Sequence, residues 1–110
     1  MGEGGASLAE VPVGWHPLLR RLDEQLSMID PAYVVFRVTS TFGALEFAAR
    51  AAALDRAERS RFGSVIEDAA WESITVCEVC GGEARQYVIR LRVWTVCAGH
   101  AHEIAGTAAN

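Results

Sequence analysis

Four potential metal ligands in the last third of the chain constrain its fold more than any other feature. Cys77, Cys80, Cys97 and His100 form the pattern C-x2-C-x16-C-x2-H, in which the two ligands of each pair lie three residues apart. In a chain without a secretion signal, such a pattern favours a metal or catalytic site over structural disulfides. Zn²⁺ prefers four tetrahedral ligands, and three thiolates with one imidazole are a common closed structural set. The spacing therefore predicts a structural zinc site made by these four residues.

Other interpretations of the motif stay open at this point. A redox-active C-x2-C normally opens a helix after a strand, whereas Gly81 and Gly82 follow Cys80 and suit a sharply turning metal knuckle. The cysteines could instead be inert core residues, although that would not explain a Cys-x2-His pair at this distance. His102 would replace His100 in a C-x4-H pair, but the shorter spacing matches the first pair and favours His100.

The motif does not indicate a catalytic zinc. Catalytic sites usually keep three protein ligands and an open position for water, whereas four candidate ligands imply a closed site. A zinc deaminase needs an H-x-E motif upstream of P-C-x2-C, but here both nearby histidines follow the cysteines and no proline precedes Cys77. An enzyme with a site remote from the zinc stays an alternative. Its candidate residues, whose spacing favours no particular chemistry, are His16, Asp30 and Glu46.

A first helix is predicted over residues 15–29. Apolar residues recur there at helical spacing from Trp15 to Ile29, while charged residues fill the other face, which is typical of an amphipathic helix on a core. Pro17 falls where the first turn tolerates proline. The helix should end at Asp30, because the proline that follows pushes this residue out of the α region.

A hairpin and a second helix are predicted next. Residues 33–39 are rich in β-branched and aromatic residues and residues 44–48 alternate in polarity, so we expect two antiparallel strands with a polar turn over residues 39–41. Residues 53–72 again place apolar side chains on one helical face. Gly63 predicts a break in that helix, because glycine costs about 1 kcal/mol relative to alanine in a helix interior.

The segment between the two ligand pairs is predicted to be extended. Residues 85–94 alternate as one long strand that leads back to the second pair. The fold class is therefore α+β, with a helix–β-hairpin–helix body and a C-terminal zinc-ribbon-like β lobe. The binding free energy of such zinc sites, of order 10 kcal/mol, is largely folding free energy, which matters in a small domain with a thin core.

The length of 110 residues corresponds to one domain. We expect a single zinc-stabilised domain over residues 14–104, a flexible tail over residues 1–13 and a second tail over residues 105–110. The predicted core consists of Leu18, Leu22, Leu26, Val34, Phe36, Leu45, Phe47, Phe62, Ile66, Ile89 and Leu91.

Net charge and the distribution of apolar residues disfavour several classes of protein. The formal net charge is −4, which disfavours a strongly basic nucleic-acid binder. No apolar run approaches the roughly 20 residues that span a bilayer, and the start of the chain has neither the basic residues nor the apolar stretch of a secretion signal. We therefore expect a cytoplasmic protein without a membrane partner.

Several short motifs over residues 14–102 occur together. They are the apolar stripe that begins at Trp15, the stretch Phe42-Gly43-x-Leu45-x-Phe47, and the two segments Cys77-Glu78-x-Cys80-Gly81 and Trp94-x2-Cys97-x2-His100-Ala101. Together they resemble a group of small, largely uncharacterised bacterial and phage proteins with a C-terminal zinc-ribbon-like pair of knuckles. The resemblance implies the same zinc ligands and no particular activity.

These observations favour a non-catalytic interaction or regulatory module with a structural zinc and a protein partner. One alternative is a nucleic-acid-binding zinc ribbon. Arg90, Arg92 and Trp94 share a face of the predicted strand, where they could contact phosphates and stack on a base. The simpler interpretation of this face is a solvated surface on which the tryptophan packs against an arginine stem.

Overall fold

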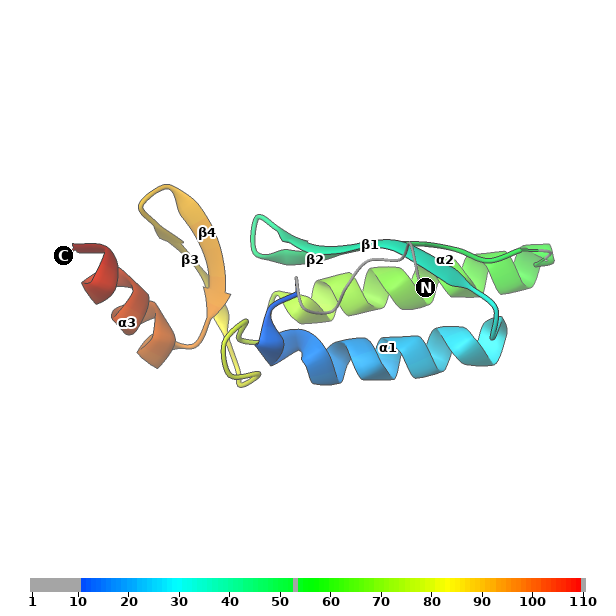
Figure 1. The fold of residues 1–110 in the computed structure, drawn as a ribbon, viewed down its shortest axis with the longest axis horizontal. Coiled ribbons are helices and arrows are strands. Elements are labelled where there is room, and N and C mark those ends of the chain that lie inside the picture. The colour runs from blue at the N-terminus through cyan, green and yellow to red at the C-terminus, as the bar shows by residue number, and fades with distance from the viewer. Residues whose placement is uncertain (1–10, 53, 110) are drawn as a thin grey trace.

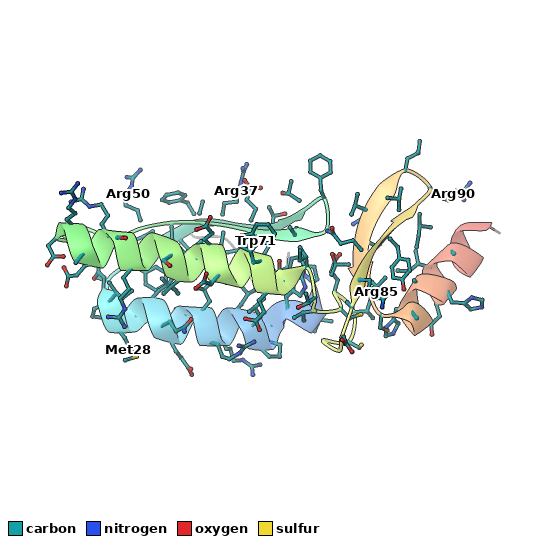
Figure 2. All side chains as sticks on the ribbon, turned by 180° about the vertical axis from the view of Figure 1, so that it is seen from behind. Met28, Arg37, Arg50, Trp71, Arg85 and Arg90 are labelled. Carbon is teal, nitrogen blue, oxygen red and sulfur yellow. The ribbon has the colours of Figure 1, made fainter. Side chains whose placement is uncertain are left out.

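The computed structural model describes residues 11–52 and 54–109 and confirms the α+β class (Figure 1). A 3₁₀ helix (Val13–Trp15) leads into α1 (His16–Ile29), the hairpin of β1 (Val34–Thr41) and β2 (Ala44–Arg50), and then α2 (Arg56–Ser73). A second hairpin of β3 (Arg85–Ile89) and β4 (Arg92–Val96) precedes α3 (Ala98–Ala109). We call the described residues up to Thr75 the body, and residues 76–109 the C-terminal lobe.

The body has two layers. Figure 1 shows α1 and α2 side by side along the β1–β2 hairpin, with the β3–β4 hairpin and α3 beyond one end of the body. The apolar stripe predicted for the first helix lies at the centre of this core, where Trp15, Leu22 and Leu26 are fully buried. The helix begins with Pro17 in its first turn and ends before Asp30, whose backbone is extended, as the sequence predicts.

A β-bulge in β1 brings two predicted core residues to the surface. The register shifts between Val35 and Arg37, which leaves Phe36 as the extra residue of the strand. A bulge reverses the alternation of side chains on one side of it. Val38 beyond the bulge is buried, whereas Val34 and Phe36 are 58% and 50% exposed. The prediction that these two residues lie in the core was therefore wrong.

The turn of the first hairpin also differs from the prediction. β1 continues through Thr41, so the turn is Phe42-Gly43 and not residues 39–41. Both turn residues have positive φ angles, 53° and 78°, as the two-residue turns that match the twist of a hairpin require. Glycine adopts this conformation freely.

The second helix is continuous, so the predicted break near Gly63 does not occur. Asp55 and Glu58 form a reciprocal capping box at its start, with hydrogen bonds of 2.8 and 3.0 Å from each backbone N–H to the other side chain. This cap and the burial of Phe62 and Ala69 against the core outweigh the cost of about 1 kcal/mol for one glycine.

The C-terminal lobe is a hairpin followed by a helix, and not a single strand. Arg90 and Leu91 divide the predicted strand as a two-residue turn, with φ angles of 53° and 68°. Leu91, predicted in the core, is consequently 97% exposed. The expected tail from residue 105 continues α3 as far as Ala109, because its alanines favour helix. The small buried core of this lobe is formed by Cys77, Ala84, Val96 and Ala101.

Residues 1–10 of the expected N-terminal tail lie outside the described residues, whereas Val11 packs in the body core.

The remaining predicted core residues are buried to different degrees. The buried predicted residues are Leu18, Leu22, Leu26, Leu45 and Phe62, and the partly buried ones are Phe47, Ile66 and Ile89.

The two lobes meet where the 3₁₀ helix touches the chain just after the body. The indole N–H of Trp15 donates a hydrogen bond to the carbonyl oxygen of Val76 over 2.9 Å. The backbone N–H of Gly14 donates to the carbonyl oxygen of Glu78 over 2.8 Å. The first cysteine of the metal motif, Cys77, is thus held between two residues that are anchored to the body.

Candidate metal centre

The four predicted zinc ligands come together in the C-terminal lobe. Cys77 and Cys80 lie in the turn between α2 and β3, Cys97 follows β4, and His100 lies in the first turn of α3. One ligand atom from each residue can be chosen so that all four atoms lie within 4.8 Å of one another. This set of side chains could hold a metal ion.

Three distances between ligand atoms are close to those expected around a tetrahedral ion. With bonds of about 2.3 Å to sulfur and about 2.0 Å to nitrogen, neighbouring sulfurs lie about 3.8 Å apart and sulfur lies about 3.5 Å from nitrogen. The Sγ atoms of Cys80 and Cys97 are 4.0 Å apart. His100 Nδ1 lies 3.1 Å from Cys97 Sγ and 3.7 Å from Cys77 Sγ.

Both sulfurs of the first ligand pair accept hydrogen bonds from backbone N–H groups of nearby residues. Val79 donates to Cys77 Sγ and Gly82 donates to Cys80 Sγ, each over 3.4 Å. The turn is closed by backbone hydrogen bonds from Gly81 to Cys77 over 2.9 Å and from Cys77 to Gly82 over 2.8 Å. Gly81 has a φ angle of 81°, which glycine adopts without strain. The predicted glycine knuckle is therefore present.

The second ligand pair is built differently, because α3 begins directly after Cys97. The backbone N–H of Ala101 donates to the carbonyl oxygen of Cys97 over 2.9 Å, which starts the helix. Residues three apart share one side of a helix, so His100 faces back toward Cys97. His102 is exposed on α3 and is not part of the four-residue set.

The surroundings of two of the three sulfurs, those of Cys77 and Cys97, favour the thiolate form. Burial acts to raise the pKa of Cys77, but the backbone N–H groups of Cys80, Cys97 and Val79 outweigh this effect and lower its pKa to about 6. The backbone N–H of His100 lowers the pKa of Cys97. Because the thiolate is the form that binds metals, these N–H groups prepare both sulfurs for an ion.

The pKa values of the other two candidate ligands, His100 and Cys80, are raised in the metal-free site. Side-chain hydrogen bonds to Cys77 and Cys97 raise the pKa of His100. The backbone N–H of Gly82 acts to lower the pKa of Cys80, but the neighbouring cysteine side chains outweigh it and raise this pKa. A metal ion must displace these protons, so its affinity for the site increases with pH.

Glu78 supports the centre, and the sequence analysis did not single it out. Its carboxylate is buried and accepts hydrogen bonds from the backbone N–H of Thr95 over 2.8 Å and from the hydroxyl of Ser40 over 3.5 Å. Glu78 thereby connects the first knuckle to the strand that leads to Cys97. An acidic residue inside C-x2-C is usually solvated, so no sequence signal distinguishes this one.

Arg90, Arg92 and Trp94 were considered for nucleic-acid binding, but two of them stack on each other. The guanidinium carbon of Arg92 lies 4.0 Å from the centroid of the Trp94 ring, so one ring face is covered. Trp94 also packs on the small core of the C-terminal lobe. Arg90 lies in the hairpin turn and not on the strand. This arrangement favours a packed surface, and nucleic-acid binding stays an untested prediction.

The candidates for a remote enzyme site do not form a group. In the described residues, the cluster of histidine, cysteine and acidic side chains suited to a metal is the four-residue set above, and it contains none of His16, Asp30 and Glu46. Glu46 accepts hydrogen bonds from Thr41 and Arg37 on the hairpin surface, and the hydrogen bond from Thr41 is the main cause that lowers its pKa.

Comparisons with protein-family models, with curated proteins and with solved structures give no match. Among the residues that the structure describes, no helix has both the length and the apolar character needed to cross a membrane.

Proposed function

We propose that this chain is a small zinc protein in which Cys77, Cys80, Cys97 and His100 bind one structural Zn²⁺. The observation that carries the proposal is the convergence of their four ligand atoms within 4.8 Å. Three thiolates and one imidazole suit zinc, because soft sulfur ligands in a closed tetrahedral set select zinc over magnesium or calcium. With all four positions supplied by the protein, no position is left for a substrate or a catalytic water.

The zinc would cross-link the C-terminal lobe internally, and the knuckle that it orders is hydrogen-bonded to the body through Gly14. Its ligands come from the knuckle after α2 and from the start of α3, so the ion connects segments that share only a small apolar core. Binding free energy of order 10 kcal/mol would then appear largely as folding free energy. A cytoplasmic location, which we also propose, would keep the thiols reduced.

We further propose that the folded chain acts as an interaction or regulatory module with a protein partner. Large apolar side chains on both hairpins support this role, since Phe42, Val88 and Leu91 are all largely exposed and would leave water on contact with a partner. The resemblance to small bacterial and phage zinc-knuckle proteins remains a prediction, and it adds no activity to this proposal.

Metal analysis of the purified protein, prepared without chelator, tests the zinc site. We expect one zinc per chain, and we expect the double variant Cys77→Ser/Cys80→Ser to bind none and to lose at least the folded C-terminal lobe by circular dichroism. No stoichiometric metal in the wild-type chain, or an unchanged melting temperature in the double variant, would refute the proposal. Pull-down from the native host with mass spectrometry would then identify the partner.

A further inference from the structure

Two cysteines of the metal centre lie next to each other near the surface. Cys80 is exposed and Cys97 is partly exposed, and their Sγ atoms are 4.0 Å apart. Cys77, by contrast, is 0% exposed, and its sulfur accepts a hydrogen bond from the backbone N–H of Val79. A reagent that arrives from solvent therefore meets Cys80 and Cys97 but is kept from Cys77.

A pocket gives small molecules a route to Cys97. It has a volume of about 360 Å³ and lies between β3 and the start of α3, where Cys97 forms part of its wall. Glu83, Arg85 and Tyr87 also line it, and the pocket is large enough to admit a small polar molecule such as a peroxide. A small molecule can thus reach Cys80 directly from solvent and Cys97 through the pocket.

We propose that Cys80 and Cys97 form an oxidation site, at which a peroxide converts the two thiolates into a disulfide and the metal ion is released. The inference rests on the proposed function, because it concerns the same four ligands. Cys77 remains reduced, since its sulfur is fully buried.

The chemistry balances with hydrogen peroxide as the oxidant. The Cys80 thiolate attacks one peroxide oxygen, the O–O bond breaks, and the products are a sulfenic acid and hydroxide. The Cys97 thiolate then attacks the Cys80 sulfur, forms the S–S bond and displaces hydroxide. In sum, two thiolates, one peroxide and two protons give one disulfide and two waters, and two electrons pass from sulfur to oxygen.

The metal leaves because the product offers too few ligands. Sulfurs in a disulfide are no longer anionic donors, so the site keeps only Cys77 and His100, whereas a structural zinc needs four ligands. The new bond connects the same two segments that the ion connected, the first knuckle and the start of α3. Oxidation therefore exchanges one cross-link for another and frees the Cys77 thiol and the His100 imidazole.

The test uses the zinc-loaded full chain. Its zinc content is measured first, one equivalent of hydrogen peroxide is added, and released zinc is followed with a colorimetric chelator. Remaining thiols are alkylated, and the unreduced protein is digested with trypsin and an endoprotease specific for glutamate. Cleavage after Glu78 places Cys77 and Cys80 on separate peptides, and cleavage after Arg92 separates both from Cys97.

We expect one zinc released per disulfide, a linkage between the Cys80 and Cys97 peptides, and alkylated Cys77. Zinc that is present at the start but stays bound, a disulfide that includes Cys77, or a disulfide between two chains would overturn this inference. A chain that holds no zinc before peroxide is added would instead refute the proposed function, so the two failures are distinguishable.

Discussion

The backbone N–H of Gly14 donates a hydrogen bond to the carbonyl oxygen of Glu78 over 2.8 Å, which joins the entry to α1 with the first metal knuckle. The contact is so close that a Cβ on Gly14 would overlap the carbonyl oxygen of Cys77 and lie 2.7 Å from the carbonyl carbon of Glu78. The helical body and the candidate metal centre thus share one packed backbone junction. Changes at this junction should affect both.

The first prediction concerns the variant Gly14→Ala. The added methyl group meets backbone atoms of Cys77 and Glu78, which cannot rotate away as side chains do, so the two lobes must separate. We expect the free energy of unfolding to fall by about 1–3 kcal/mol, the usual cost of overpacking, and zinc affinity to fall as well. Urea denaturation and a competing chelator measure the two effects.

Gly63→Ala is the matched control. Nothing lies within 4 Å of the position that its Cβ would take, and the residue is inside α2. Alanine should therefore raise the free energy of unfolding by about 0.5–1 kcal/mol. A change of stability in the same direction for the variants at Gly14 and Gly63 would contradict the close packing of Gly14 against Cys77 and Glu78.

The second prediction concerns the hydrogen bond between the two hairpins. The hydroxyl of Thr95 on β4 donates to the carbonyl oxygen of Gly43 over 2.5 Å, and Thr95 is fully buried. Thr95→Val keeps the shape of the side chain but leaves a buried carbonyl without this donor. We expect a loss of about 1–3 kcal/mol in the free energy of unfolding, measured by urea denaturation.

Thr75→Val makes the same chemical change at an exposed site. The Thr75 hydroxyl donates to the carbonyl oxygen of Glu72 over 2.8 Å, where water can replace it. We expect a change within about 0.5 kcal/mol. Equal effects of the two substitutions would show that the bond between Thr95 and Gly43 does not hold the hairpins together.

The sequence could predict the features that rest on local repetition. The stripe from Trp15 to Leu26 follows the helical period, and the Pro17 and Asp30 signals fall at the ends of the helix. The four side chains that could hold a metal ion were also predicted to lie together, because thiols and imidazoles at this spacing indicate one shared site. The helical stripe and the Cys/His pattern both consist of residue types at fixed spacings, which can be read from the sequence alone.

The first antiparallel hairpin was predicted, but features that depend on the register of strand pairing could not be predicted. Phe36 becomes the extra residue of a bulge only because of how β1 pairs with β2, and regular alternation places it in the core. Arg90 and Leu91 form a turn with positive φ angles, although neither residue type favours that conformation. The antiparallel pairing of β3 with β4 imposes this turn, and the local propensities of the two residues do not indicate that pairing.

The role of Glu78 also depends on contacts between distant parts of the chain, so the sequence could not predict it. A carboxylate in a solvent-facing knuckle and a buried carboxylate that accepts the N–H of Thr95 have the same sequence signature. The difference arises only when β4 and β1 pack on the knuckle from elsewhere in the chain. Sequence analysis therefore finds the ligands of such a centre more readily than the groups that position them.

The third prediction separates the two candidate histidine ligands. His100 Nδ1 lies 3.1 Å from Cys97 Sγ, whereas His102 is exposed outside the set. We expect His100→Ala to lower zinc affinity by more than the roughly 10- to 100-fold that loss of an outer partner costs. His102→Ala should leave the affinity unchanged in the same chelator competition. The reverse order would move the fourth ligand to His102.

The last prediction is a pH dependence that arises in the body, away from the metal centre. The hydroxyl of Tyr33 donates to Asp23 over 2.5 Å. Burial, and then the hydrogen bond to Asp23 and its negative charge, raise the pKa of Tyr33 above its ordinary value near 10. The folded chain thus keeps this proton to a higher pH than the unfolded chain does.

The sign of the effect follows from this difference. Below about pH 10 both states hold the phenol proton, so the contribution to stability is complete and constant. Above that pH the unfolded chain loses the proton first, and the free energy of unfolding falls as the pH rises. Tyr33→Phe removes the titrating group but keeps the ring that packs edge-on against Phe62 with centroids 5.9 Å apart. We therefore expect the stability of the wild type to decline more steeply than that of Tyr33→Phe above about pH 10. Parallel curves, or ionisation of Tyr33 at its ordinary pKa in an absorbance titration, would contradict the expected effect of burial and of Asp23 on this phenol.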